Sequence, residues 1–401
     1  MIYNNSIHNF DRFISEWNSN NEYVLFGASK ECVQFIRTMD FLLGSHKLKI
    51  KYIVDHDIKN KTTLTNIDEI SSFFRKSKNI KTNRSGIELI HIDDFDLTKN
   101  EKVIITSDVY RNFYKEYLET NNVTYTTYKH IAGIWPLKYK NLVHIFQTDV
   151  LVTEKCTLAC SHCNMFMPHF VSPNHRDIGI IKSDIDSFFN LTDYVSVFHL
   201  VGGEPFLHPQ MEDVIEYVLH NHIDKIDKFI ITTNGTILPK QSTLELLKTN
   251  DVILSVSDYT DKLEHIQKKV EKVIQTLKDW DINHYVRTEI EWYDFGDLRI
   301  KNNLPTNKLI KHFDSCTAPF RGLNDGKFYY CHLNTSAVLT KLFPLDSNDY
   351  VDLSTTTKED LIKFDLGYTD LGYITFCDNC NGCNTGIKIP VSYEKQGIRD
   401  L

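Results

Sequence analysis

The stretch Lys155-Cys156-Thr157-Leu158-Ala159-Cys160-Ser161-His162-Cys163 spaces three cysteines as C-x3-C-x2-C. This spacing wraps three thiolates around one corner of a metal cluster. Iron–sulfur centres are ordinarily held by four cysteine thiolates, so a loop that supplies three leaves one iron without a protein ligand. A small molecule is then expected to complete the coordination of that iron, which makes the loop a site for chemistry.

Two further motifs follow the cysteine loop, Gly202-Gly203-Glu204-Pro205 and Thr233-Asn234-Gly235-Thr236. In order and spacing, the three motifs together resemble the radical SAM enzyme superfamily. The resemblance implies a 4Fe-4S cluster held by Cys156, Cys160 and Cys163, with S-adenosylmethionine (SAM) at the open iron.

The same resemblance assigns roles around SAM. His162 stands where the family usually carries a flat side chain beside the adenine. The Gly-Gly-Glu-Pro strand end is where the family binds the methionine amino group, and a glycine pair lets backbone approach a ligand closely. The Glu204 carboxylate, or the backbone beside it, can accept hydrogen bonds from an ammonium. The residues expected to bind SAM are His162, Gly202, Gly203, Glu204, Pro205, Thr233, Asn234, Ser255, Ser257 and Asp258.

Zinc and disulfides are the alternatives for this cysteine group. Structural zinc takes a closed set of four ligands, and nothing nearby supplies the fourth at a usual spacing, since His162 is wedged between two of the cysteines. The chain begins Met1-Ile2-Tyr3-Asn4-Asn5 without an apolar signal segment, which predicts a reducing, cytoplasmic compartment where disulfides are rare.

Length and composition predict an α/β protein of two or three domains. The chain has 401 residues, a hydrophobic content of 41%, and no run of about eighteen apolar residues that would predict a membrane span. Its net charge of -8 argues against a nucleic-acid partner. We expect an N-terminal Rossmann-like parallel sheet (1–140), a central partial (β/α)6 TIM-like barrel (141–305) and a small cysteine-rich auxiliary-cluster domain (306–401).

The first of these parts alternates strands and helices. The apolar run Tyr23–Phe26 ends at Gly27-Ala28-Ser29 and passes into a predicted helix over Lys30–Leu43. This alternation predicts a parallel sheet with right-handed crossovers. The other elements expected here are strands over Lys49–Val54 and Lys102–Thr106 and a helix over Val109–Leu118.

Gly27 and Asp55 match part of a dinucleotide-binding fingerprint, but Ser29 and Cys32 stand where that fingerprint requires glycines. Nicotinamide binding is therefore not favoured. This part resembles the Rossmann-like domains of sugar-modifying enzymes from surface-polysaccharide pathways, which implies that it positions a substrate or a partner. A purely structural role stays open, and Cys32 is interpreted as a small core residue.

In the middle part, each motif is expected at the C-terminal end of a strand. Loops at that end build the active sites of barrels, so we expect the three motifs to lie together at one end of the barrel. Ser255, Ser257 and Asp258 match the ribose diol in chemistry; alternatively, one of them caps a helix starting near Lys262. The expected strands are His144–Val152, Val195–Val201, Phe229–Thr233 and Val252–Val256.

The segment Asn164–Phe170 directly follows the cysteine loop, so it is expected near the SAM sulfonium. Its methionines and phenylalanines either shield a radical from water or serve as ordinary core. His169, His175 and Arg176 are candidate substrate contacts.

A second cysteine group begins with Cys316, and the spacing Cys316-x9-Gly326-x4-Cys331 resembles the SPASM and twitch extensions of radical SAM enzymes. Asp325-Gly326 predicts a tight turn between two short strands. The resemblance implies one auxiliary cluster, because this region holds five cysteines and a 4Fe-4S cluster takes four. The expected ligands are Cys316, Cys331, Cys377 and Cys380; Cys383 is an alternative ligand or a thiol that donates a hydrogen atom. A tetrahedral zinc site competes with this interpretation.

The resemblance implies reductive cleavage of SAM to a 5′-deoxyadenosyl radical, which abstracts hydrogen from a substrate carbon. An electron donor such as flavodoxin or ferredoxin is implied as a partner. The leading hypothesis is a small-molecule substrate, a sugar or related metabolite of polysaccharide or secondary metabolism, that is oxidised or epimerised. The alternatives are a peptide-modifying maturase and a non-catalytic iron–sulfur or zinc-binding protein.

Overall fold

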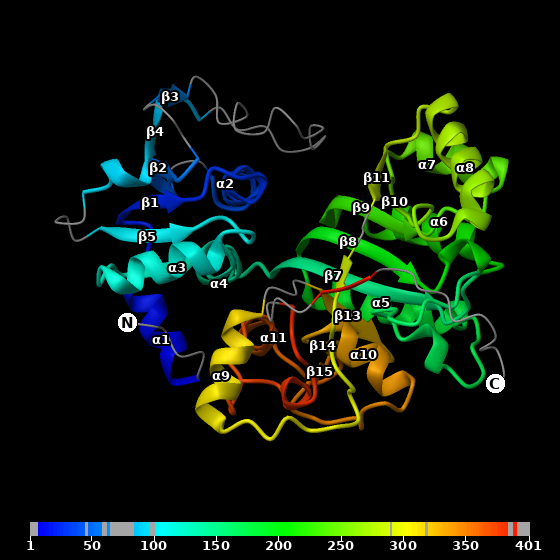
Figure 1. Ribbon diagram of the computed structural model, residues 1–401. Helices are drawn as coiled ribbons and strands as arrows, with labels where there is room; N and C mark the ends of the chain where they lie inside the picture. The colour runs from blue at the N-terminus through cyan, green and yellow to red at the C-terminus, as the bar shows by residue number, and fades with distance from the viewer. Residues whose placement is uncertain are drawn as a thin grey trace. The chain divides into compact units, whose positions relative to one another are not determined.

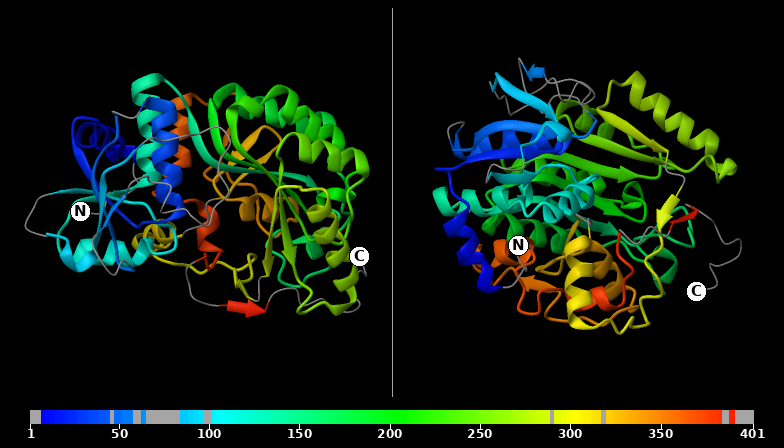
Figure 2. Two further views of the ribbon diagram at one scale, coloured as in Figure 1. Left: turned by 90° about the horizontal axis from the view of Figure 1, so that it is seen from above. Right: turned by 60° about the vertical axis from the view of Figure 1, so that its left-hand side comes forward.

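The computed structural model describes residues 7–44, 47–57, 62–64, 84–96, 101–288, 291–316, 320–383 and 388–390 (Figures 1 and 2). The segment Met1–Asn5, on which the expected compartment rests, lies outside them. The chain divides into two compact units, Met1–His144 and Ile145–Leu401. The predicted boundary between residues 305 and 306 within the second unit stays a prediction. In the described part of the chain, every helix is too short or too polar to cross a membrane.

The first unit is built on a six-stranded sheet of order β3-β4-β2-β1-β5-β6. All of its strand pairs are parallel except the antiparallel β3 and β4. This confirms the predicted parallel sheet. Its elements are α1 (Ile7–Glu16), β1 (Glu22–Phe26), α2 (Lys30–Leu43), β2 (Lys49–Asp55), β3 (Thr62–Leu64), β4 (Ile87–His91), η2 (Ile92–Asp94), β5 (Lys102–Ile105), α3 (Arg111–Thr120), β6 (Tyr125–Thr127) and α4 (Tyr128–Lys140).

The turn between β1 and α2 shows why the sequence folds this way locally. Gly27 has φ +108°, and a Cβ there would lie 2.7 Å from the Ser107 Cβ, so the position requires glycine. The Ser29 side chain accepts a hydrogen bond from the Cys32 amide and caps α2. Asp55, at the end of β2, accepts a hydrogen bond from the Ala28 amide at 2.7 Å. Cys32 is fully buried, as a core residue should be.

The second unit is built on an eight-stranded sheet of order β11-β10-β9-β8-β7-β13-β14-β15, with a separate antiparallel pair β12 and β16. Its elements are β7 (His144–Thr153), η3 (Met167–His169), α5 (Ile178–Leu191), β8 (Tyr194–Gly202), η4 (Pro205–Leu207), α6 (Met211–Asn221), η5 (Ile223–Lys225), β9 (Ile226–Thr233), α7 (Gln241–Thr249), β10 (Ile253–Asp258), η6 (Glu264–Ile266), α8 (Gln267–Asp279), β11 (His284–Thr288), β12 (Glu291–Tyr293), α9 (Thr306–Ser315), β13 (Arg321–Asn324), β14 (Lys327–Tyr329), α10 (His332–Leu339), β15 (Tyr350–Asp352), α11 (Lys358–Asp365), η7 (Thr375–Asp378) and β16 (Lys388–Pro390).

Parallel pairs join β8 to β9, β9 to β10 and β10 to β11, and strands alternate with α5, α6, α7 and α8. The mixed α/β fold with an open, barrel-like parallel sheet is as predicted. β13 does not extend the sheet beyond β11; it pairs in parallel with β7 at the opposite side. The antiparallel strands β14 and β15 then continue the sheet outward. The C-terminal cysteine region is therefore joined to the first strand of the barrel-like sheet through the pairing of β13 with β7.

The predicted helix near Lys262 begins later than expected. A short 3-10 turn precedes it, and α8 starts at Gln267 after Ile266 as its N-cap residue. The Asp258 carboxylate instead accepts hydrogen bonds from the Thr260 amide and hydroxyl within a local turn. The capping role considered for Ser255, Ser257 or Asp258 is therefore wrong, because the chain turns before the helix begins.

Candidate functional site

The first cysteine loop leaves the end of β7 and is held by the end of β8. The Gly203 amide donates to the Thr153 carbonyl and the Glu204 amide donates to the Lys155 carbonyl, both at 2.9 Å. Within the loop, the Cys163 amide donates to the Cys160 carbonyl at 3.1 Å. The loop and the Gly-Gly strand end are thereby one structure, although thirty-eight residues separate Cys163 from Gly202 in the sequence.

All three cysteines gather in one apolar cluster with Leu158, Leu263, Ile266 and Val270. Burial raises the pKa of the Cys156 thiol to about 12. A thiolate at this place therefore requires a compensating positive charge, which a bound metal supplies. The donor set and its apolar surroundings fit an iron–sulfur cluster.

The glycine pair forms a cradle against this loop. A Cβ at Gly203 would lie 2.3 Å from the Lys155 carbonyl oxygen and 2.8 Å from the Cys156 Cβ. A Cβ at Gly202 would lie 2.9 Å from the Thr153 carbonyl oxygen. Real side chains do not tolerate such approaches, so these two positions need glycine for close backbone packing.

The Glu204 side chain is fully buried and binds the third motif. Its carboxylate accepts hydrogen bonds from the Thr233 hydroxyl at 2.9 Å and the Asn234 amide at 2.8 Å. Burial raises the pKa of Glu204 to about 7. The carboxylate is therefore engaged inside the protein, and the contact of the SAM ammonium stays a prediction.

Asn234 links the third motif to the cysteines. Its side-chain amide donates to Thr157 Oγ1 at 3.1 Å and reaches Cys156 Sγ at 3.5 Å. The hydroxyls of Thr157 and Thr236 also share a hydrogen bond of 2.5 Å. The three motifs recognised in the sequence therefore meet in one place.

At the end of β10, the expected ribose contacts differ in their surroundings. Ser255 is 1% exposed, and its hydroxyl has no hydrogen-bond partner among the described residues. Ser257 Oγ accepts a hydrogen bond from Arg287 at 3.1 Å. An orphaned buried hydroxyl is costly, and a bound ligand that bonded Ser255 would remove that cost. The His162 side chain is exposed on the cysteine loop.

The methionine-rich segment after the loop packs beside the cysteines, and its predicted place near the SAM sulfonium stays a prediction. Met167 and Phe170 form a small buried cluster with Leu151, and Met165, Cys156 and Cys163 pack against it. Of the three candidate substrate contacts, His169 is exposed and His175 Nδ1 lies 2.9 Å from Thr153 Oγ1.

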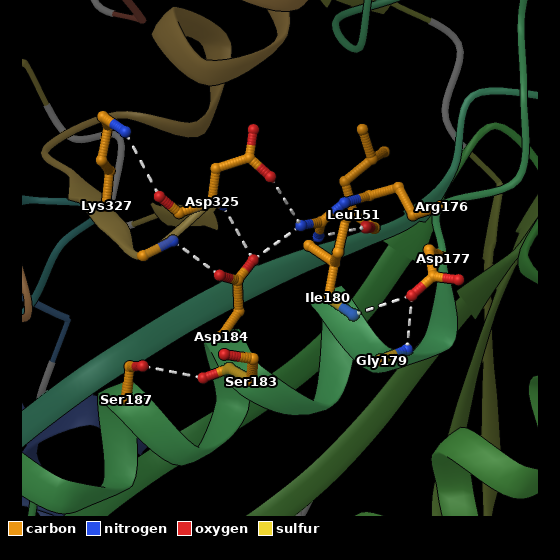
Figure 3. A network of polar contacts seen from close by, with 11 residues as sticks. Leu151, Arg176, Asp177, Gly179, Ile180, Ser183, Asp184, Ser187, Asp325 and Lys327 are labelled. Atoms are coloured by element: carbon orange, nitrogen blue, oxygen red, sulfur yellow. Dashed lines mark hydrogen bonds and ion pairs between the residues drawn. The ribbon is translucent and has the colours of Figure 1, made fainter.

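Arg176, the third candidate, is committed to the fold. Its guanidinium donates to the Leu151 carbonyl at 3.0 Å and pairs with Asp184 at 2.6 Å (Figure 3). Asp184 is 2% exposed and also accepts the backbone amides of Asp325 and Gly326 at 2.9 and 2.6 Å. Arg176 therefore anchors the turn of the β13–β14 hairpin, and this use replaces the expected substrate contact.

The second cysteine group also converges. Cys331, Cys377 and Cys380 lie in one buried cluster with Phe313 and Leu333. A hydrogen bond between the Cys383 and Cys316 thiols, followed by burial, raises the pKa of Cys383. Burial, with Cys316 nearby, likewise raises the pKa of Cys331 to about 12. The Asp325-Gly326 turn between β13 and β14 is confirmed, with φ +50° and +69°.

The second unit is thus an α/β fold with two groups of buried cysteines, and the first group offers three thiolates from one loop. Residues 150–285 match the model of the Radical SAM superfamily. The family implies a 4Fe-4S cluster and SAM.

Three curated relatives are similar to parts of the chain. The antilisterial bacteriocin subtilosin biosynthesis protein AlbA of Bacillus subtilis is 31% identical over 113 residues, 26% of this chain and 22% of that protein. An S-adenosylmethionine-dependent nucleotide dehydratase of Selenomonas ruminantium is 29% identical over 120 residues, 29% of this chain and 41% of that protein. A GTP 3′,8-cyclase of Clostridium acetobutylicum is 23% identical over 264 residues, 58% and 75% of the two chains. The chain thus spans less than half of the first two relatives.

Among solved structures, anSMEcpe with bound AdoMet and the Cp18Cys peptide is 15% identical with a TM-score of 0.41, covering 60% of this chain and 89% of that one. BtrN in complex with AdoMet and 2-DOIA is 14% identical with a TM-score of 0.36, covering 63% and 98%.

Sequence motifs did not reveal two polar groups of the second unit. Asp184 lies on α5 far from any motif, and only its partners across the fold explain it. Asp149 and His199 stand within strands and bind each other. The polar stretch Gln147-Thr148-Asp149 inside β7, between Ile145-Phe146 and Val150-Leu151-Val152, is a local sign of the latter.

Proposed function

We propose that this chain is a radical SAM enzyme that reductively cleaves SAM and abstracts a hydrogen atom from its substrate. The observation that carries the proposal is the joining of the three-cysteine loop to the Gly202-Gly203 strand end and to Asn234. When bound, the cluster and SAM supply a 5′-deoxyadenosyl radical.

The residues of the chain hold and shield these groups. Cys156, Cys160 and Cys163 would hold the cluster. The backbone at Gly202–Pro205 would receive the methionine ammonium, with Thr233 and Asn234 supporting that strand end. Met167 and Phe170 would exclude water from the mouth. The proposed SAM site is completed by His162, which would lie beside the adenine. The ribose would be bound by Ser255, Ser257 and Asp258.

For the auxiliary site we keep Cys316, Cys331, Cys377 and Cys380 as proposed ligands of one iron–sulfur cluster. The hydrogen bond between Cys383 and Cys316 supports Cys383 as a group at the same site, either as a replacement ligand or as a hydrogen-atom donor. Iron and zinc analysis of the purified chain separates the cluster from a zinc site.

The proposed substrate is a sugar or related metabolite, which is oxidised or epimerised, with flavodoxin or ferredoxin as the electron donor. The parallel sheet of the first unit supports a small molecule, since it resembles domains of sugar-modifying enzymes. A second candidate is a peptide substrate, favoured by the similarity to AlbA, which is named for bacteriocin biosynthesis.

The test is the formation of 5′-deoxyadenosine by the chain reconstituted with iron and sulfide without oxygen, given dithionite and SAM. We expect product from the native chain and from Cys32→Ala, a matched control that removes a cysteine from the other unit. Cys163→Ala should give none. Equal amounts from Cys163→Ala and the native chain would assign the three-cysteine loop a structural role.

A further inference from the structure

A row of polar side chains crosses one face of the large sheet. The cysteine loop lies on the same face. β7 supplies Gln147 and Asp149, β8 supplies His199 and β9 supplies Thr232. Gln147 donates to Asp149 Oδ1 at 2.8 Å, His199 Nδ1 lies 3.2 Å from the same oxygen, and His199 Nε2 lies 2.7 Å from Thr232 Oγ1. The row is therefore continuous over three strands.

Strand alternation fixes which face this is. Phe198 packs against Phe189 of α5 with ring centroids 5.4 Å apart, so His199, the next residue, points away from that helix. Leu151, two residues after Asp149, packs against Met167 and Phe170 beside the cysteine loop. The polar row accordingly shares a face with the site proposed for SAM.

The row is rich in hydrogen-bond acceptors. Burial opposes the charge of Asp149, but His199 and the other partners hold the pKa of Asp149 below its ordinary value. An ionised Asp149 accepts the N–H of His199 Nδ1, and His199 Nε2 shares a hydrogen bond with the Thr232 hydroxyl. Both nitrogens of His199 are engaged in these bonds, whereas Thr232 Oγ1 keeps at least one lone pair for a further donor. No described residue donates a hydrogen bond to Asp149 Oδ2.

A second observation indicates a missing ligand. α10 lies against Gly322, which is in register with Asp149, and a Cβ at Gly322 would be 3.2 Å from the Cα of His332. His332 is 6% exposed, and its Nδ1 has no hydrogen-bond partner in the described part of the chain. That nitrogen lies 3.8 Å from Asp149 Oδ2, too far for a direct bond.

The ionised Asp149 supplies a negative charge at the middle of the row, where its titratable neighbours among the described residues are His199 and His332. Such a surface favours hydrogen-bond donors and repels carboxylates and phosphates.

We propose that this polar row binds the donor groups of a polyhydroxylated substrate, hydroxyls or an ammonium, and excludes anionic groups from the inner face of the sheet. This inference rests on the proposed function, because it names the class of molecule that the same site acts on. Thr232 Oγ1, Asp149 Oδ2 and His332 Nδ1 are the contacts, and Asp149 supplies the charge. His199 joins Asp149 to Thr232 and holds both in place.

The test is saturation-transfer NMR of the reconstituted chain with SAM and three probes of similar size: myo-inositol (neutral), glucosamine (cationic) and gluconate (anionic). We expect transfer to myo-inositol, to glucosamine or to both, at least about fivefold above gluconate. The pair of positive probes distinguishes hydroxyl from ammonium recognition. Equal transfer to gluconate, or transfer to none of the three, overturns the proposal.

Variants locate the binding. Asp149→Asn should reduce binding of the preferred probe by about tenfold and remove the discrimination against gluconate. Thr232→Val changes no charge and should weaken binding while the discrimination persists, which keeps the test decisive where Asp149→Asn fails to fold. Asp93→Asn, an 85% exposed carboxylate of the other unit, is the control. Unchanged probe binding in folded Asp149→Asn and Thr232→Val overturns the assignment.

Binding is read without turnover, so the two proposals fail separately. If the native chain binds myo-inositol but forms no 5′-deoxyadenosine, the proposed enzyme function is refuted and the proposed binding by the polar row stands. If the native chain forms 5′-deoxyadenosine but does not discriminate between the probes by charge, the proposed enzyme function stands and the proposed binding by the polar row is refuted.

Discussion

Gly203 is the residue on which the proposed SAM site depends most directly. A Cβ there would overlap the Lys155 carbonyl at 2.3 Å and the Cys156 side chain. We expect Gly203→Ala to displace the cysteine loop and to lower both bound iron and 5′-deoxyadenosine formation by at least about tenfold. Iron analysis and product quantification check this. The control is Gly179→Ala in the first turn of α5, which meets only an Asp177 side-chain oxygen at 3.0 Å and should keep both.

His144 carries a pH dependence of the first unit. The side chain is fully buried, its Nδ1 lies 3.0 Å from the Ala132 carbonyl oxygen, and burial lowers its pKa to about 4. The unfolded chain binds a proton near pH 6.5, so the stability contributed by neutral His144 is complete above that pH and is lost as pH falls toward 4.

The expected loss is roughly 3 kcal/mol of unfolding free energy between pH 6.5 and 4. Hydrogen exchange of the α4 amides measures it, because α4 contains Ala132. His144→Gln should flatten this pH dependence. An equally steep fall in the variant would assign the dependence to other groups.

At the scale of single residues, the sequence predicts what is local. The three cysteines of one loop and the glycine pair at a strand end can be recognised from their spacing alone. The sequence predicts a substrate contact at Arg176, because nothing near it in the sequence reveals Asp184 as its partner. The sequence likewise does not show what the Glu204 carboxylate binds, since Thr233 and Asn234 reach it only in the folded chain.

Among the elements, the β13–β14 hairpin depends on one carboxylate of α5. Asp184 accepts both amides of the turn and pairs with Arg176 (Figure 3). Because this hairpin runs directly into Cys331, we expect Asp184→Asn to lower iron from about eight to about four atoms per chain through loss of the auxiliary cluster. SAM cleavage at the first cluster should persist.

Iron analysis and electron paramagnetic resonance of the reduced chain check this expectation. Asp186→Asn is the matched control, since Asp186 lies on the same helix and binds Tyr217 and His222 instead. A full iron complement in Asp184→Asn would show that the hairpin keeps its position without the carboxylate.

Hydrophobic periodicity predicted α2 with both ends correct, and it placed the strands that carry the motifs. It failed at α8, where a 3-10 turn delays the helix. It also gave no indication that β13 joins β7, because pairing between strands so far apart in sequence depends on the closed fold and not on any local period.

For the whole molecule, the division at His144 predicts that residues 145–401 fold without the first unit. We expect this fragment to bind iron in the same amount as the full chain and to form 5′-deoxyadenosine, since every proposed ligand lies within it. Iron analysis and product formation by the purified fragment check this. An insoluble or iron-free fragment would mean that the first unit is needed to build the sites.

The pairing of β13 with β7 determines where the chain can be truncated without exposing the edge of the sheet. A chain ending at residue 305 would lose the neighbour of β7 and present a row of unpaired backbone groups, the usual template for edge-to-edge aggregation. The cysteine-rich segment is therefore not a detachable module. We expect deletions and fusions to be tolerated near residue 144, and we expect an exchange of the C-terminal cysteine region to succeed only when β13 to β15 are exchanged with it.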